Sequence, residues 1–241
     1  FPAVYEMLSN IKAKLDAGRA LLYQTARYVD IYKALDDIAR ERKLTPEERA
    51  EQKKYAKLAD AFTPLAKVMN SEYANQNGYD CIQVHGGSGF MLEYACQRIY
   101  RDARITSIYE GTTQLQVVAA IRYVTTGLYS QVIADYEQVE CKPEFQGYLN
   151  RIKAMTEKFN ADVEAVKAAN NQDLLDICAR HLYEEAANII MAHLLLQNTN
   201  KAPELSANSL KVYMNLSESE VEKHHNFISR MDPEQLAAYK K

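Results

Sequence analysis

The sequence of 241 residues contains no tryptophan, only 8 glycines and 6 prolines, and no run of apolar residues long enough to span a membrane. Few residues that form turns, together with abundant Ala, Leu, Lys, Glu and Gln, favour a mostly helical protein. The length is sufficient for one large domain or two small ones, each with a buried core. We therefore expect an all-α fold without a membrane span.

The cysteines and the charge exclude further classes of protein. The four cysteines form no C-x-x-C pair, so we expect neither structural zinc nor a disulfide framework, and we expect a cytoplasmic location. The formal net charge of −3 is not typical of a nucleic-acid-binding protein. The sequence begins with Phe-Pro-Ala, without a signal-peptide pattern, which is consistent with a fragment of a longer chain.

Residues 1–130 are predicted to form four helices, because apolar residues recur there at helical spacing. The first helix carries Leu8, Ile11, Leu15, Leu22, Ala26 and Val29 at that spacing. Thr45 and Glu48 are typical of a capping box at the start of the second helix, and Pro64 is a candidate kink within it. The expected ranges are 3–42, 46–84, 93–106 and 112–130. Four such helices predict an antiparallel four-helix bundle.

Beyond residue 130, three more helices are expected after the break at Lys142-Pro143, near 144–169, 172–198 and 206–228. Residues 131–241 hold 12 Lys and Arg against 17 Asp and Glu, a net charge of −5, whereas residues 1–130 carry +2. We interpret residues 1–130 as one module and residues 131–241 as an additional C-terminal helical domain packed on it.

The densest cluster of glycines is "HGGSGF", from His85 to Phe90. Consecutive glycines expose backbone N–H groups, which suggests nucleotide binding. However, the cluster lacks the Lys-Ser/Thr ending of a P-loop and follows a predicted helix rather than a strand. On spacing alone its residue types favour a helix terminator, since glycine readily adopts the left-handed conformation.

Glu110 lies at the junction between two predicted helices, followed by Gly111 and Thr112. As a surface acid it would stabilise the start of the next helix, with Thr112 as the cap. As a functional acid it would project into a cleft as a general base, with its own backbone N–H available to a developing oxyanion. The spacing of these residues leaves both interpretations open.

Other polar groups are interpreted as structural. Arg98, Arg101 and Arg104 share one side of a helix, which is typical of a solvated face. No histidine pair has the spacing of a metal site, so no metal is expected. This applies to His181, His193, His224 and His225.

The stretch "QVHGGSGFMLEYACQRIYRDARITSIYEGTTQLQ", from Gln83 to Gln116, resembles the signature near the C-terminus of the acyl-CoA dehydrogenase family. The spacing is kept over more than thirty positions, which makes it far more specific than any single motif within it. The resemblance identifies residues 1–130 with the C-terminal four-helix domain of that family. Residues 131–241 resemble the extra helical region of longer members.

The resemblance implies α,β-dehydrogenation of a fatty acyl-CoA with FAD as the cofactor. Glu110 matches the base that removes the α proton, and its N–H would hold the thioester oxygen together with a flavin hydroxyl. Burial against substrate and flavin is expected to raise the pKa of this carboxyl group. Gly111 and Arg122 match substrate-contacting positions, although Arg122 also fits a helix position from which its charge reaches solvent.

The resemblance also assigns the cofactor contacts. One segment would meet the FAD of the same subunit, and the other would meet the adenine half of the FAD of a neighbouring subunit. The first segment is Thr112, Thr113 and Gln114, and the second is Gln83, Val84, His85, Gly86 and Gly87. The resemblance further implies a homodimer or homotetramer, with an electron-transfer flavoprotein as the electron acceptor.

The sequence departs from the family pattern at Phe90, where tyrosine is usual, and at Ala95, where proline is usual. The family's N-terminal helical domain and middle β-domain are absent, so these residues alone are not expected to turn over substrate. Two alternatives stay open. One is an acyl-CoA oxidase-type flavoenzyme of the same superfamily. The other is a non-catalytic helical scaffold or DNA-associated relative, which the negative extension and the intact Glu110 argue against.

Overall fold

The computed structural model describes residues 1–239, which fold into helices and contain no β-strand. This confirms the all-α class. The helices are α1 (Pro2–Glu41), α2 (Pro46–His85), α3 (Gly87–Phe90), α4 (Ala95–Ile105), α5 (Thr113–Thr125), α6 (Leu128–Glu137), α7 (Gln146–Ala168), α8 (Gln172–Lys201) and α9 (Pro203–Arg230). Two short 3₁₀ helices, η1 (Pro143–Phe145) and η2 (Pro233–Tyr239), complete the described chain.

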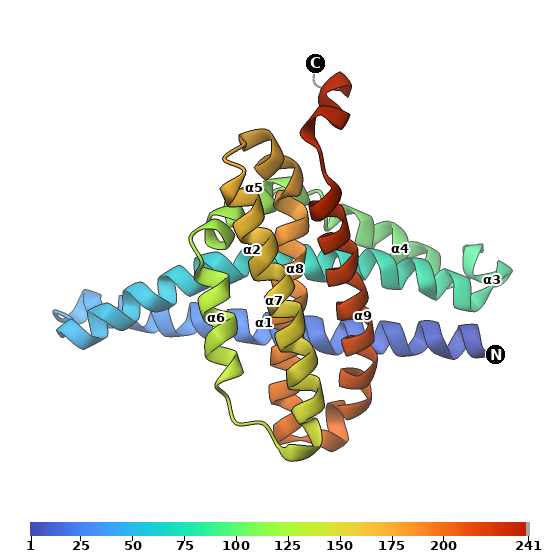
Figure 1. Ribbon diagram of the computed structural model, residues 1–241. Helices are drawn as coiled ribbons and strands as arrows, with labels where there is room; N and C mark the ends of the chain where they lie inside the picture. The colour runs from blue at the N-terminus through green and yellow to red at the C-terminus, as the bar shows by residue number, and fades with distance from the viewer. Residues whose placement is uncertain (240–241) are drawn as a thin grey trace.

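The long helices α1 and α2 pack side by side as an antiparallel pair, and the helices of the C-terminal half cross this pair at a steep angle (Figure 1). Helix α4 returns along α2, and α5 then packs between α2 and α8. The C-terminal half also contacts α1 through α8 and α9. The predicted extension is therefore packed on the first module.

Local sequence signals explain several of the helix ends. Thr45 and Glu48 form the predicted capping box, in which each side chain accepts a hydrogen bond from the other residue's backbone N–H. Helix α2 continues through Pro64. The prediction of one helix over 112–130 is wrong in its extent, because Gly127 adopts a left-handed φ of 78° and the chain bends by 68° between α5 and α6.

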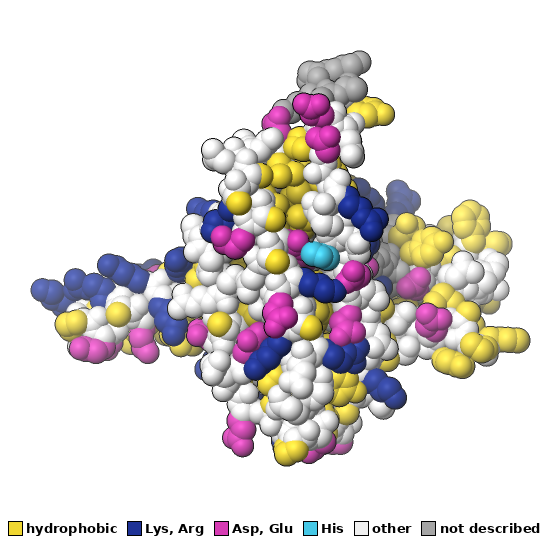
Figure 2. All heavy atoms as spheres, in the orientation of Figure 1, with side chains coloured by type: hydrophobic (Ala, Val, Ile, Leu, Met, Phe, Trp, Pro, Cys, Tyr) yellow, Lys and Arg dark blue, Asp and Glu magenta, His cyan; other side chains and the backbone are white. Residues whose placement is uncertain are grey.

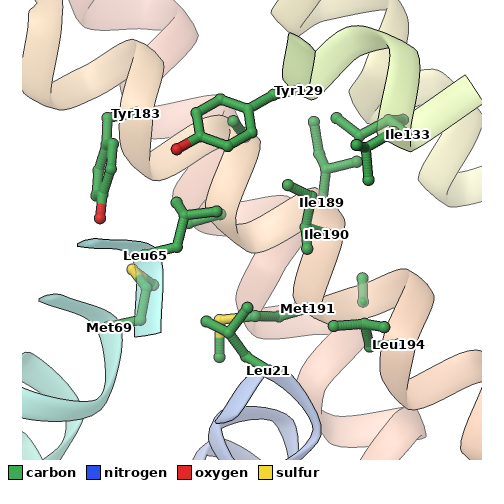
Figure 3. Packing of buried hydrophobic residues seen from close by; sticks show 14 of the residues in the cluster. Leu21, Leu65, Met69, Tyr129, Ile133, Tyr183, Ile189, Ile190, Met191 and Leu194 are labelled. Atoms are coloured by element: carbon green, nitrogen blue, oxygen red, sulfur yellow. The ribbon is translucent and has the colours of Figure 1, made fainter. Parts of the chain in front are cut away.

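The core is continuous across both halves of the chain and centres on α8. Side chains around the whole circumference of this helix are buried from Ala186 to Leu196, which is typical of a helix surrounded by others. Figure 3 shows Ile189, Ile190 and Met191 of α8 among side chains from α1, α2 and α6. The domain boundary expected at residue 130 falls inside α6. The division of the chain into two domains at this residue stays a prediction.

Several large apolar side chains face outward. On α1, part of the stripe used to predict the helix is exposed, namely Leu8, Leu15 and Leu22, whereas Ala13, Ala17 and Leu21 are fully buried. Apolar side chains also gather at the end of the molecule that carries α3 (Figure 2). Within residues 1–239, no single helix is apolar and long enough to cross a membrane, and the bent pair α5–α6 meets that test only jointly.

His193 of α8 makes stability sensitive to acid. The side chain is 1% exposed, its Nε2 has no hydrogen-bond partner among the described residues, and burial together with Lys153 lowers its pKa to about 4. The unfolded chain binds a proton near pH 6.5, so stability should fall as the pH drops from there towards 4. His193→Leu is expected to reduce this slope by up to about 1.4 kcal/mol per pH unit, as measured by urea unfolding at several pH values. An unchanged slope would assign the acid sensitivity to other groups.

Candidate active site

Glu110 occupies a strained position in the loop between α4 and α5. Its φ is 51°, and that of Gly111 is 90°, so two consecutive residues lie in the left-handed region. For a residue with a side chain, such a conformation costs about 1–3 kcal/mol and persists where surrounding contacts enforce it. The Glu110 side chain is exposed, so the described residues do not supply the burial expected around it.

Two long side chains hold the backbone of this loop. The Gln116 amide donates from Nε2 to the Glu110 carbonyl at 3.1 Å, and Lys67 of α2 donates from Nζ to the Gly111 carbonyl at 2.6 Å. A Cβ added to Gly111 would lie 2.7 Å from Gln116 Nε2, so a larger residue there would displace this anchor. Both contacts hold the chain directly after the Glu110 Cα, at the carbonyls of Glu110 and Gly111.

The backbone beside the Glu110 carboxylate is rich in available donors. The N–H groups of Glu110, Gly111 and Thr112 donate to no protein acceptor within residues 1–239. Thr112 is the N-cap of α5 and accepts from Leu115 N–H at 3.3 Å, as the capping pattern predicts. The positive end of the α5 macrodipole therefore lies next to these groups, and the loop favours negative charge.

Thr113 is turned inward, whereas its neighbour Gln114 is exposed. The Thr113 hydroxyl donates to Glu72 Oε1 at 2.8 Å, and its N–H donates to the Ser107 carbonyl at 3.2 Å. Its predicted cofactor contact stays a prediction, and the structure gives its hydroxyl a partner in α2.

The C-terminal half of the chain is connected to the start of α5 indirectly, through Glu72 of α2. Arg180 of α8 lies 3.9 Å from Glu72 Oε1 and pairs with Glu184 at 2.6 Å. Burial alone would raise the pKa of Glu184, but hydrogen bonds from His224 and Arg180 hold that pKa at about 2. A negative Glu184 fixes Arg180, which contacts the carboxylate that holds Thr113.

The second predicted segment, Gln83–Gly87, closes α2. Gly86 ends the helix with a φ of 59°, which confirms that the glycine cluster terminates a helix. Beyond its neighbours in the chain, an added Cβ at Gly86 or Gly87 would meet no atom of the described residues within 4 Å, so the backbone faces open space. Gln83 and His85 are exposed, and Val84 is half-buried.

The two predicted cofactor segments lie at opposite ends of α4 (Figure 1). This helix has 11 residues and is therefore about 16 Å long. The two predicted segments thus form two separate surfaces on a single copy of the chain.

Arg122 lies near the end of α5, three turns beyond Glu110. Its guanidinium donates to Asp60 at 2.6 Å and to the Tyr123 hydroxyl at 2.7 Å. The side chain remains 62% exposed, so it reaches solvent in the way that its helix position predicted. Its predicted contact with substrate stays a prediction.

Sequence reasoning missed the residues that position the loop. Lys67 and Glu72 are ordinary charged residues in a long helix, and no spacing marks them. Gln116 belongs to the matched signature, but its role follows only from the contact with Glu110. Arg98, Arg101 and Arg104 are exposed, as expected of a solvated face.

The fold and the strained carboxylate define a helical protein with a candidate acid–base site, and two family models identify the family. The model described as "Acyl-CoA dehydrogenase, C-terminal domain" matches residues 1–124, and the model described as "Acyl-CoA dehydrogenase C terminal" matches residues 125–236. The chain therefore belongs to the acyl-CoA dehydrogenase family.

Individual relatives agree with this assignment. The chain is 31% identical over 205 residues to butyryl-CoA dehydrogenase of Syntrophomonas wolfei, covering 80% of this chain and 31% of the relative. It is 32% identical over 116 residues to caffeyl-CoA reductase-Etf complex subunit CarC of Acetobacterium woodii, covering 48% of this chain and 24% of the relative. The chain thus spans less than a third of the length of these curated relatives.

A solved structure shows the same fold. The acyl-CoA dehydrogenase of Bacillus anthracis complexed with FAD superposes with a TM-score of 0.70, covering 99% of this chain and 44% of that chain at 22% identity. The similarity of fold therefore extends over both halves of the chain.

Proposed function

We propose that this chain forms the catalytic-base region of an FAD-dependent acyl-CoA dehydrogenase, with Glu110 as the base. The observation that carries the proposal is the conformation of Glu110. The exposed carboxylate of a residue in the left-handed region lies next to backbone N–H groups that have no acceptor among residues 1–239. This combination suits removal of a proton beside a carbonyl group, which requires a base and an oxyanion donor together.

In this proposal Glu110 accepts the α proton of the acyl-CoA thioester on its carboxylate. The Glu110 N–H donates to the thioester oxygen, where negative charge develops, and the start of α5 adds its dipole. A donor of this kind typically contributes about 3–4 kcal/mol to transition-state stabilisation. FAD, when bound, supplies the acceptor for the hydride that leaves the β carbon. Gly111 would contact the substrate beside the base.

The residues present fit a flavin nucleotide at two places. Gly86 and Gly87 leave the backbone open to a flat ligand, next to Gln83, Val84 and His85. Thr112 and Gln114 are exposed at the start of α5. Because α4 separates the two places, we infer that one chain contacts two flavins in a homodimer or homotetramer.

The proposal includes further polypeptide around the site. Leu115 and Val118 of α5 are 59% and 57% exposed, and Ile105 and Ile108 are also exposed next to the Glu110 loop. Burying such side chains stabilises an assembly by about 25 cal/mol per Å² of apolar surface. We infer that the flavin ring site and the acyl-CoA pocket are completed by polypeptide outside residues 1–241, so this chain alone does not turn over substrate.

We propose the electron-transfer partner and the direction of the reaction from what the relatives are named for. One relative is named as a subunit of a reductase–Etf complex, which supports an electron-transfer flavoprotein as the partner. The same name favours a second candidate function, reduction of an enoyl-CoA. We place the protein in the cytoplasm, because its four cysteines are all free.

The test uses the natural polypeptide that carries residues 1–241, purified with FAD. Saturated acyl-CoAs of increasing chain length are added without oxygen, and the absorbance of oxidised flavin is followed. We expect bleaching with at least one chain length, and we expect residues 1–241 alone to hold no FAD and to show no bleaching. Rapid reoxidation by oxygen would identify an oxidase, and reoxidation of reduced flavin by enoyl-CoAs alone would identify a reductase. Tight acyl-CoA binding without any flavin reaction would contradict the proposal.

A further inference from the structure

The end of α2 and the start of α4 bring together three side chains that bind transition metals. Cys81 Sγ, His85 Nδ1 and Cys96 Sγ all lie within 4.8 Å of one another. We propose that these residues bind a divalent metal ion of zinc type. Such a site is independent of the proton-abstraction chemistry at Glu110, which lies beyond the other end of α4.

The geometry is close to that of a tetrahedral site. Cys81 and His85 are one turn apart on α2, with Sγ and Nδ1 separated by 4.0 Å. Metal–ligand bonds of about 2.3 Å to sulfur and 2.0–2.1 Å to nitrogen place tetrahedral ligand atoms roughly 3.5–3.8 Å apart. Coordination would therefore require a contraction of a few tenths of an ångström up to about 1 Å. It would also require His85 Nδ1 to leave its present hydrogen bond with the Cys81 carbonyl, at 2.8 Å.

The two helices hold the third ligand in place. Cys96 is 3% exposed in the first turn of α4, and its Sγ donates to the Gly89 carbonyl at 3.3 Å. Gly89 itself is pressed against α2, because an added Cβ would lie 2.5 Å from the Ile82 carbonyl oxygen. His85 is exposed, which leaves an open side for entry of the metal and for water as a fourth ligand.

The ligand types favour zinc over magnesium or calcium. Two thiols and one imidazole are borderline to soft donors, whereas the hard cations prefer oxygen ligands. Burial and the neighbouring Cys96 raise the pKa of the Cys81 thiol, which favours its protonated form in the absence of metal. Metal binding would release protons from the ligands and form thiolates. The bound ion would tie α2 to α4 and fix the turn over residues 86–94.

The test uses the reduced chain of residues 1–241 and adds Co²⁺ or Zn²⁺ alone. Co²⁺ is expected to give the visible absorption of a thiolate-bound tetrahedral ion at one equivalent, and Zn²⁺ is expected to displace it. In Cys81→Ser and Cys96→Ser the affinity for the metal ion should fall by at least about 100-fold. Loss of a residue that only supports a metal ligand already lowers metal affinity by up to about 100-fold. Cys141→Ser, which changes a cysteine outside the cluster, is the matched control and should bind like the wild type.

His85→Gln removes a ligand without disturbing the core, because the His85 side chain is exposed whereas Cys96 is buried. A loss of metal binding in this variant therefore does not result from misfolding. With an unchanged circular dichroism spectrum, this variant should also lose the absorption of tetrahedral Co²⁺. No Co²⁺ band in the wild type, or equal binding after the substitutions at Cys81 and Cys96, would overturn the proposal. These readouts need no flavin and no substrate, so they are separate from the test of the proposed function.

Discussion

Glu110→Gln is expected to slow flavin reduction by acyl-CoA by about 10²–10⁴-fold, the usual contribution of a positioned general base. Glutamine keeps the length and shape of the side chain but cannot accept the α proton. The backbone contacts from Gln116 and Lys67 are made to carbonyl groups, so they remain in the variant. The rate is measured by anaerobic stopped-flow absorbance with the natural polypeptide and its best substrate.

Two further variants make this result specific. Glu110→Asp retains a base on a shorter side chain and should keep part of the rate. Glu157→Gln changes an exposed glutamate of α7 and should match the wild type. Substrate affinity should change little in Glu110→Gln, because the loss lies in the chemical step. Equal rates of flavin reduction in Glu110→Gln and the wild type would remove Glu110 from the role of base.

Ile190→Ala is expected to lower the free energy of unfolding by about 2–5 kcal/mol, the usual range for truncating a fully buried isoleucine. Ile190 is 0% exposed in α8, the helix around which both halves of the chain pack. The truncation leaves a cavity that its helical neighbours cannot fill completely. The free energy is measured by urea unfolding, with circular dichroism reporting helix content.

The same experiment tests how the chain is divided. Leu205→Ala, at a side chain that is 74% exposed in the first turn of α9, is the matched control and should change stability by less than about 0.5 kcal/mol. Because one core joins α1, α2 and α8, we expect a single unfolding transition that shifts as a whole in Ile190→Ala. Two transitions, with only one of them shifted, would favour independent modules divided near residue 130.

Much of the helical architecture could be predicted because its signals are local. The capping box at Thr45 depends on residues three apart, and the ends of α2, α7 and α8 fall within a few residues of their expected positions. The break at Gly127 was missed because a single glycine inside an apolar segment is compatible with a continuous helix. Its left-handed φ follows from how α5 and α6 pack on the rest of the chain.

The candidate site was found through a signature of more than thirty residues, since the spacing around Glu110 alone favours a surface acid. Spacing could not show that Glu110 is strained, or that Lys67 and Gln116 hold its loop. Nor could it show that Thr113 is turned towards Glu72. These contacts join residues separated by up to 44 positions, and no local pattern encodes such pairs.

The sequence by itself determined the helical class, most of the helix starts and stops, the family resemblance and the identity of the candidate base. Each of these depends on residue types and on spacings within a few helical turns. Only the tertiary structure decided which face of α1 is buried, how α8 joins the two halves, and that Cys81, His85 and Cys96 meet. The physical reason is that such proximity arises when helices pack. A side chain's partners on another helix depend on the crossing of the two helices and not on its own neighbours in the sequence.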